Sequence, residues 1–374
     1  RDRLSRAYQL RLKKGKQKKD QDASSVVSRP TLDSRVRQKL SDMRDINKAG
    51  PFHLINASLN AQASRSEKLR GRKADFFIFS SAHCGSESTG YAPTKDYEVS
   101  NRRLDLATAA AVSGAAVAPI MGVRKDGYTF WAALLNIRLD FWLRNPRVKK
   151  WWASFPGPFY WLSQYLGRVK PSTPFVNLSD GGHIENMGLY ELLRRRCRYI
   201  VVVDGECDPG ITCGSFLQAM RYAKIDFGID VDIDLSRLKF GGSAPASLDS
   251  TDKSQKAKSS VPDSPVVDYH FALGKVKYPK TTQDASEPPH GLLLYLKSSI
   301  TGNEAASIQS YRDRNPGFPH QSTADLAYDE EQFECYRSLG EHIVDDTFRS
   351  ELIGADIPAN VADWFQSLEK HLIR

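Results

Sequence analysis

The feature that most constrains the fold is a strand, a turn, a helix and a second strand in immediate succession. The segments FVNLS (175–179) and RYIVVVD (198–204) are rich in β-branched residues, and between them lie a DGG turn (180–182) and a helical pattern from about residue 185 to 196. The unbroken apolar run in the second segment is typical of a strand buried on both faces of a parallel sheet. The sequence therefore predicts a β-turn-α-β unit and an α/β fold.

Hydrophobic periodicity predicts further elements along the chain. Residues 225–235 alternate apolar residues with aspartates, which predicts a half-buried strand. A Ser/Thr cap at 322 predicts a helix from there to 348. Residues 129–145 carry an apolar stripe at helical spacing, whereas the aromatic-rich segment 148–167 fits either a packed loop or a lipid-facing lid. We also expect short strands at 51–61 and 74–85, antiparallel strands at 268–279 and 291–299, and helices at 104–116 and 361–373.

The charge of the chain bears on the class of its partners. The formal net charge is +9, and residues 1–19 hold nine Lys or Arg against one Asp. This excess allows attraction to anionic lipid or nucleic acid. A solvated basic segment is the simpler interpretation, because beyond Tyr8 the segment lacks aromatic residues on which bases could stack. We therefore expect no nucleic acid partner; if one exists, its binding should depend steeply on salt.

Cysteine and histidine usage argues for a reduced compartment without a spacing-defined metal site. The five cysteines contain no CxxC pair, and the eight histidines contain no HExxH motif. The pattern favours neither a disulfide framework nor a zinc site, so we predict no cofactor and no metal. No run reaches about 18 apolar residues, which argues against a spanning helix. A cytoplasmic location is expected.

Asp180 is the strongest candidate for chemistry. It follows a predicted strand and precedes a helix, which places its side chain at the edge of the sheet where α/β proteins bind ligands. Gly181 and Gly182 permit a sharp turn and a close approach, Asn186 lies six residues on, and the next strand ends in Asp204. An ordinary Asp-Gly turn remains the alternative interpretation.

His183 stands three residues after this aspartate. It could line a pocket there. A histidine that forms a local hydrogen bond at the start of the helix is the favoured interpretation.

The segment SDGGHIENMGLYELLRRRCRYIVVVD (179–204) resembles the Asp-Gly-Gly/Ala segment of the patatin-like acyl hydrolases and of the related cytosolic phospholipase A2 lineage. VSGAAVAPIMG (112–122) resembles the Ser-x-Ala-Ala-x-x-Pro segment upstream of that aspartate. The resemblance covers most of residues 50–345 and points to a bacterial branch of these proteins. Further similar pieces are ALLNIRLDFWLRNP, GLLLYLKSSITG and FPHQSTADLAYDEEQFECYRSLG.

The resemblance implies a patatin-like three-layer α/β/α fold with a central, mainly parallel sheet and a C-terminal strand-and-helix extension. At 374 residues the chain is long for a single core. Residues 1–50 would form a basic, partly disordered segment, and residues 51–240 the C-terminal half of the catalytic domain. Residues 241–267 would form a flexible loop, and residues 268–374 the α/β extension.

The implied chemistry is that of a serine–aspartate dyad acting on a lipid or other acyl ester. Asp180 would be the general base, and Gly181, Gly182 and Asn186 would contact the substrate. A Gly-rich loop of backbone N–H groups would hold the oxyanion. No metal takes part in such a dyad.

The family's nucleophile motif, Gly-x-Ser-x-Gly, does not occur in the 374 residues. The nearest strings, SESTG (86–90) and GGSAP (241–245), are incomplete, and neither is assigned as the nucleophile. We expect an N-terminal portion bearing the serine to lie outside this sequence, and this chain alone to be inactive. The alternative is a catalytically inactive patatin-like module that binds anionic membranes peripherally, or binds a partner.

Overall fold

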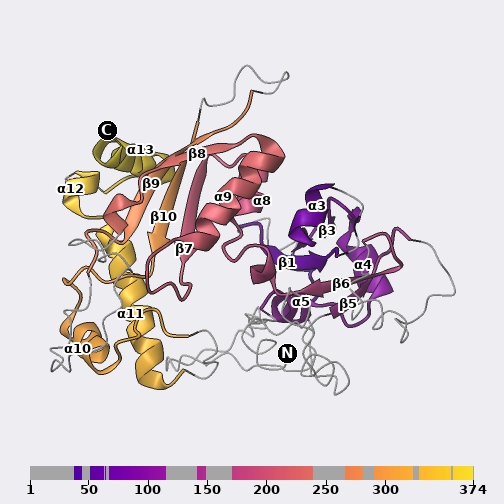
Figure 1. The fold of residues 1–374 in the computed structure, drawn as a ribbon, viewed down its shortest axis with the longest axis horizontal. Helices are drawn as coiled ribbons and strands as arrows, with labels where there is room; N and C mark the ends of the chain where they lie inside the picture. Colours follow the sequence, from indigo (N-terminus) through magenta and orange to yellow (C-terminus); the bar gives the residue numbers. More distant parts are fainter. Residues whose placement is uncertain are drawn as a thin grey trace, which may run out of the picture. The chain divides into compact units, whose positions relative to one another are not determined.

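The computed structural model describes residues 38–43, 51–62, 64, 67–114, 141–148, 171–238, 266–280, 290–322, 328–354 and 357–373. The chain divides into two compact units, Arg1–Asn186 and Met187–Arg374 (Figure 1). Apart from residues 38–43, the predicted basic segment 1–50 lies outside the described residues, as does nearly all of the predicted loop 241–267. Within the described ranges, no helix is both long enough and apolar enough to span a bilayer.

The first unit is built on a six-stranded sheet with the order β4-β3-β2-β1-β6-β5. Every neighbouring pair in it is antiparallel. The mixed α/β character is as expected, but a mainly parallel sheet is wrong for this unit. Its elements are β1 (Leu54–Asn60), α3 (Glu67–Arg72), β2 (Ala74–Ser80), β3 (His83–Ser86), β4 (Gly90–Pro93), α4 (Thr94–Ser100), α5 (Leu106–Ser113), β5 (Phe141–Arg144), β6 (Phe175–Ser179) and the 3-10 turn η1 (Gly181–His183).

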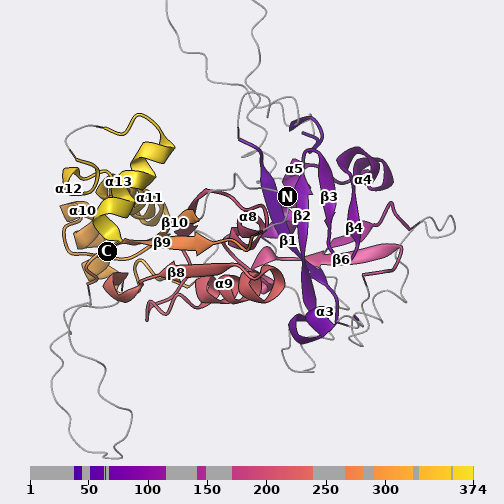
Figure 2. The same ribbon diagram turned by 90° about the horizontal axis from the view of Figure 1, so that it is seen from above.

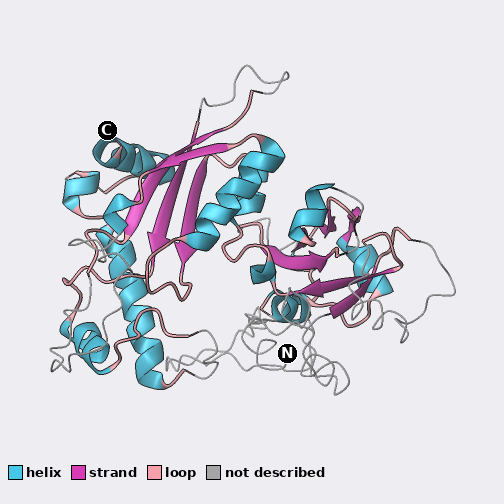
Figure 3. Cartoon of the chain, in the orientation of Figure 1, coloured by secondary structure: helices cyan, strands magenta, loops and turns pink. Residues whose placement is uncertain are grey.

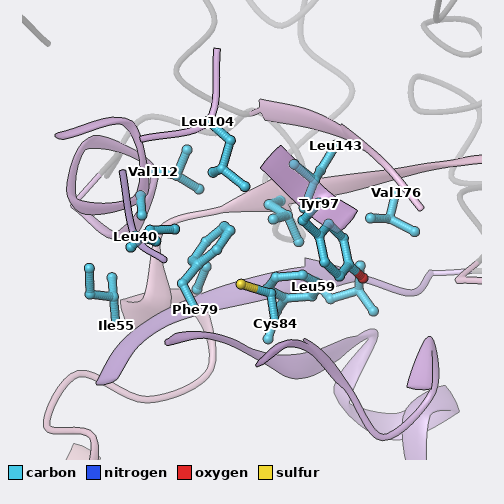
Figure 4. Close-up of a cluster of buried hydrophobic side chains, with 14 of the residues drawn as sticks. Leu40, Ile55, Leu59, Phe79, Cys84, Tyr97, Leu104, Val112, Leu143 and Val176 are labelled. Carbon is cyan, nitrogen blue, oxygen red and sulfur yellow. The ribbon is translucent and has the colours of Figure 1, made fainter. Parts of the chain in front are cut away.

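One face of this sheet carries the hydrophobic core of the unit (Figure 4). Because side chains alternate along a strand, Ile55 and Leu59 of β1 and Val176 of β6 all point into this core. Val112 of α5 and Tyr97 of α4 pack against them from the same side. The short strand predicted at 51–61 and the helix predicted at 104–116 are confirmed by β1 and α5, whereas the strand predicted at 74–85 is two antiparallel strands, β2 and β3.

The helix predicted over 129–145 is wrong where the structure describes it. Residues Phe141–Arg144 form β5, which pairs antiparallel with β6. Leu143 lies opposite Val176 and is fully buried, whereas Trp142 lies on the other face. Strand pairing supplied by a distant segment has overridden a pattern that suited a helix. Residues 129–140 lie outside the described ranges.

The second unit is a four-stranded sheet, β7-β10-β9-β8, with helices on both faces (Figures 2 and 3). Helices α8 and α9 pack on one face, and α10, α11 and α13 pack on the other. Its elements are α8 (Leu189–Arg194), β7 (Tyr199–Asp204), α9 (Gly214–Phe227), β8 (Asp230–Ile233), η2 (Ser236–Leu238), β9 (Phe271–Lys277), β10 (Gly291–Lys297), α10 (Ala306–Arg314), α11 (Glu330–Asp346), α12 (Ser350–Ile353) and α13 (Val361–Leu372).

The pairing in this sheet corrects part of the prediction. β7 is parallel to β10, but β10–β9 and β9–β8 are antiparallel, so this sheet too is not mainly parallel. β7 is an edge strand, and Val201 and Val203 are 43% and 70% exposed, so burial on both of its faces is wrong. The antiparallel pair predicted at 268–279 and 291–299 is confirmed by β9 and β10.

Two elements begin later in the sequence than predicted, each for a local reason. The strand expected at 225–235 begins only at Asp230, because α9 continues to Phe227 and ends on the left-handed Gly228. The helix expected from 322 begins at Glu330, where Asp329 caps it by accepting a hydrogen bond from the Gln332 backbone N–H. The terminal helix predicted at 361–373 is confirmed by α13.

β7 and β8 share their sheet with β9 and β10. The predicted domain limits at 240 and 268 therefore do not coincide with the division of the sheets, and they stay a prediction.

Candidate functional site

Asp180 lies directly after β6 and caps the short turn η1. Its side chain is half-buried, and Oδ1 accepts a hydrogen bond of 2.6 Å from the backbone N–H of Gly182. Among the described residues, Oδ2 has no hydrogen-bond partner. The carboxylate is therefore fixed through one oxygen while the other is available.

The two glycines after Asp180 are needed for packing. A Cβ on Gly181 would lie 3.1 Å from the backbone oxygen of Asn56 on β1. A Cβ on Gly182 would lie 2.0 Å from Asn186 Oδ1 and 3.0 Å from Asp180 Oδ1. The structure thus brings Asp180, Gly182 and Asn186 together around one turn, which is packed against β1 through Gly181. The catalytic and substrate-binding roles of these four residues stay a prediction.

His183 turns back toward the strand rather than away from it. Its Nδ1 forms a hydrogen bond of 2.9 Å with Oγ of Ser179, the fully buried last residue of β6. Burial lowers the pKa of His183, and the charge of Asp180 raises it by less. The local hydrogen bond expected for this histidine is confirmed.

A buried polar face lies beside this turn, and the sequence analysis missed it. Since Ile55 and Leu59 point into the core, the alternate residues of β1 point to the opposite face of the sheet. The polar residues on this side of the two strands are called the polar face; they are Asn56, Ser58 and Asn60 of β1 and Asn177 and Ser179 of β6. Within it, Asn60 Nδ2 donates a hydrogen bond to Asn177 Oδ1 and lies 3.5 Å from Ser179 Oγ.

Three buried atoms of the polar face have no hydrogen-bond partner in the described part of the chain: Asn56 Oδ1, Ser58 Oγ and Asn60 Oδ1. Leaving a buried polar group unpaired costs about 1–3 kcal/mol. Folded proteins rarely keep three such atoms on one strand unless a water molecule or a ligand satisfies them. The alternation of Asn, Ala, Ser, Leu and Asn over 56–60 was the signal in the sequence, since a strand with one apolar and one wet face shows the same pattern.

Asp204, the second acid singled out in the sequence, belongs to the second unit. It is buried at the end of β7 and forms an ion pair of 3.1 Å with Lys297 Nζ. Tyr295 donates a hydrogen bond to its other oxygen, and burial together with this contact raises the pKa of Tyr295. The carboxylate is thus occupied on both oxygens, which favours a structural role.

Comparison with known proteins gives a narrow result. No protein-family model matches the chain, and no curated protein matches it. Among solved structures, the chain is similar to human GIVD cytosolic phospholipase A2, with 16% sequence identity and a TM-score of 0.44. The alignment covers 90% of this chain and 47% of that one. The chain therefore spans about half the length of the solved structure that it matches.

Proposed function

We propose that this chain carries the general-base part of an acyl-ester hydrolase that acts on lipid, with Asp180 as the base. The nucleophilic serine would come from polypeptide outside these 374 residues, because the sequence contains no Gly-x-Ser-x-Gly motif. A remote relationship to the patatin-like hydrolases, a cytoplasmic location and peripheral contact with anionic membranes belong to the same proposal. The resemblance of residues 179–204 supports them.

The observation that carries the proposal is the way in which the Asp180 carboxylate is held. A general base must be aimed at its proton donor and must keep a lone pair free for it. The Gly182 N–H fixes Oδ1 at 2.6 Å and leaves Oδ2 open. On the other side of the turn, the Asn186 side chain leaves no room for a Cβ on Gly182.

In the proposed reaction, Oδ2 of Asp180 accepts the hydroxyl proton as the serine oxygen attacks the ester carbonyl. The same proton then passes to the alcohol as it leaves, and water repeats the two steps on the acyl-enzyme. The polar face supports this assignment, because a bound water molecule or polar ligand would satisfy its unpaired atoms beside the turn. Asp180 neither bonds to the acyl group nor needs a metal for this role.

The decisive experiment compares Asp180→Asn with Asp234→Asn in the protein extended to include a serine motif. Asp234 is an exposed aspartate whose Oδ1 also accepts a hydrogen bond, of 2.8 Å, from the N–H two residues on. Loss of a general base lowers kcat by about 10²–10⁴-fold, so we expect that loss for Asp180→Asn and none for Asp234→Asn. Equal hydrolysis of phospholipid vesicles by both variants would refute the assignment.

The same assays separate the hydrolase from a binding module. If the extended protein sediments with anionic vesicles, releases no fatty acid and is unaffected by Asp180→Asn, it is a non-catalytic membrane-binding protein. The 374-residue chain by itself should not turn over p-nitrophenyl esters. Turnover that Asp180→Asn abolishes would mean that a serine within this chain performs the attack.

A further inference from the structure

A second polar cluster, independent of Asp180 and of the proposed hydrolysis, lies in the second unit. His270 immediately precedes β9, Glu304 lies in the loop after β10, and His342 lies on α11. One ligand atom from each of the three comes within 4.8 Å of the others. His270 and Glu304 are buried, and His342 is half-buried. Asp346, one helical turn after His342, adds a second carboxylate.

The separations in this cluster suit atoms arranged around an ion. His270 Nε2 lies 3.8 Å from Glu304 Oε1 and 3.7 Å from Asp346 Oδ2, and His342 Nε2 lies 3.8 Å from the same aspartate oxygen. These gaps exceed hydrogen-bonding distance. Two ligands at about 2.1 Å from a tetrahedral ion are separated by roughly 3.4 Å. A shift of a few tenths of an ångström would bring these pairs to that spacing, and the remaining pairs of ligand atoms, which lie within 4.8 Å of one another, would have to close by up to about 1.4 Å.

The hydrogen bonds around His270 allow a lone pair to face the acids. Ser299 Oγ donates to the Lys297 carbonyl at 3.1 Å and can then accept from His270 Nδ1 at 3.0 Å. A metal would select this tautomer, because Nε2, which lies 3.1 Å from Thr301 Oγ1, then faces Glu304 and Asp346 with its lone pair. Histidine ligands of metals are held in this way, with the second ring nitrogen donating to an oxygen.

Asn303 Oδ1 lies 2.9 Å from His342 Nε2 and would give up this hydrogen bond if Nε2 bound a metal. The single hydroxyl hydrogen of Thr301 faces His270 Nε2 at 3.1 Å, Asn303 Oδ1 at 2.6 Å and Glu304 Oε1 at 3.2 Å. Asp346 pairs with Arg349 through Oδ1. In the described part of the chain no Lys or Arg pairs with the buried Glu304 carboxylate, whose backbone donors are the N–H groups of Thr301 and Gly302. Buried carboxylates are normally paired with a cation or bound to a metal.

We propose that His270, Glu304 and His342 bind one divalent transition-metal ion, with Asp346 as a fourth oxygen ligand. Two imidazoles and one or two carboxylates suit Zn²⁺ and its first-row neighbours, whereas Mg²⁺ and Ca²⁺ prefer oxygen alone. The ion would join α11 to the start of β9 and to the loop after β10. It would thus clamp the helical layer onto the sheet.

The test uses the 374-residue chain, freed of any affinity tag, stripped with chelator and dialysed against Zn²⁺. We expect one Zn²⁺ per chain, a higher melting temperature with Zn²⁺ than with chelator, and no such shift with Mg²⁺ or Ca²⁺. His342→Gln and Asp346→Asn should each weaken Zn²⁺ binding by at least the roughly tenfold loss seen when a residue that only supports a metal ligand is replaced. The matched controls, the exposed His371→Gln and Asp345→Asn, should bind Zn²⁺ as the wild-type chain does.

The identity of the ligands can be read without any variant, which keeps the proposal testable if a substitution prevents folding. All five cysteines are free and could bind Zn²⁺ themselves. The spectrum of the Co²⁺-loaded wild-type chain should show d–d bands without a sulfur-to-metal charge-transfer band. A sulfur band, the absence of stoichiometric Zn²⁺, or full binding by His342→Gln would each overturn the proposal.

Discussion

Replacement of Lys297 by Met tests whether the second unit is held together by a buried ion pair. The Lys297 side chain is fully buried and that of Asp204 is 1% exposed, with Nζ 3.1 Å from Oδ1. Removing one partner of such a pair costs about 3–5 kcal/mol, because the other charge stays buried. We expect a loss near 3 kcal/mol in the free energy of unfolding, since Tyr295 still donates to Asp204. Hydrogen exchange of the β7 and β10 amides across a urea series measures the opening of this unit.

Two further variants show whether the stranded charge is the cause. Adding Asp204→Asn to Lys297→Met removes that charge and keeps an acceptor for the Glu206 backbone N–H, so most of the loss should be recovered. Lys277→Met breaks the exposed Lys277–Asp232 pair, with side chains 59% and 73% exposed, and should change stability by less than about 1 kcal/mol. A cost below about 1 kcal/mol for Lys297→Met, or a double variant no more stable than Lys297→Met, would refute the reasoning.

Two more predictions concern the turn and the histidine cluster. Gly181→Ala should cost about 1–3 kcal/mol, since its Cβ would lie 3.1 Å from the backbone oxygen of Asn56; an unchanged midpoint in urea would contradict this. Burial lowers the pKa of His270 to about 4, so as the pH falls the unfolded chain binds the proton before the folded chain does. In chelator, the free energy of unfolding should therefore fall by up to about 3 kcal/mol between pH 6.5 and about pH 4. His270→Gln should flatten that slope in urea titrations. The charged groups that face this ring are Glu304, His342, Asp346 and Arg349.

Elements set by local pattern could be predicted from the sequence. β1 alternates apolar and polar residues, β2 is an apolar segment bounded by turn residues, and α13 shows a clear helical stripe, so short-range periodicity was enough. The hairpin-like pair β9 and β10 was also predicted, because adjacent antiparallel strands are the commonest arrangement of neighbours along a chain. These elements need no information from distant segments.

Pairing between distant segments could not be predicted. Phe141–Arg144 reads as part of a helix, yet it forms a strand because β6 offers it a partner. The apolar run of β7 predicts a strand buried on both faces, yet Val201 and Val203 are 43% and 70% exposed, and within the described residues β7 pairs with β10 alone. Hydrophobic periodicity reports which side chains of a segment are apolar. It does not report which strands pair with the segment, because that depends on residues far away in the sequence.

The same limit explains what was missed at the two candidate sites. The turn at Asp180 was predicted because the aspartate, its glycines and Asn186 follow one another in the sequence. The polar face and the histidine cluster were not, because strand register assembles the first, and strand register together with the packing of α11 assembles the second. Antiparallel pairing of β1 with β6 sets Ser58 opposite Ser179, and pairing of β9 with β10 brings His270 to Ser299 at the end of the sheet.

Burying the polar side chains of the polar face and of the histidine cluster costs free energy. That cost makes these two sites informative. Each unpaired buried group lowers stability by about 1–3 kcal/mol. This is a sizeable share of the free energy of unfolding of a domain, which is about 5–15 kcal/mol. Sequence reasoning assigns buried positions to apolar residues, so it treats β1 as ordinary core and His270 as incidental. Where the fold buries Asn60 or His270 instead, a bound ligand, water molecule or ion is the most direct means of offsetting the cost. Ligand or metal binding at these positions should therefore raise the stability of the unit that contains them.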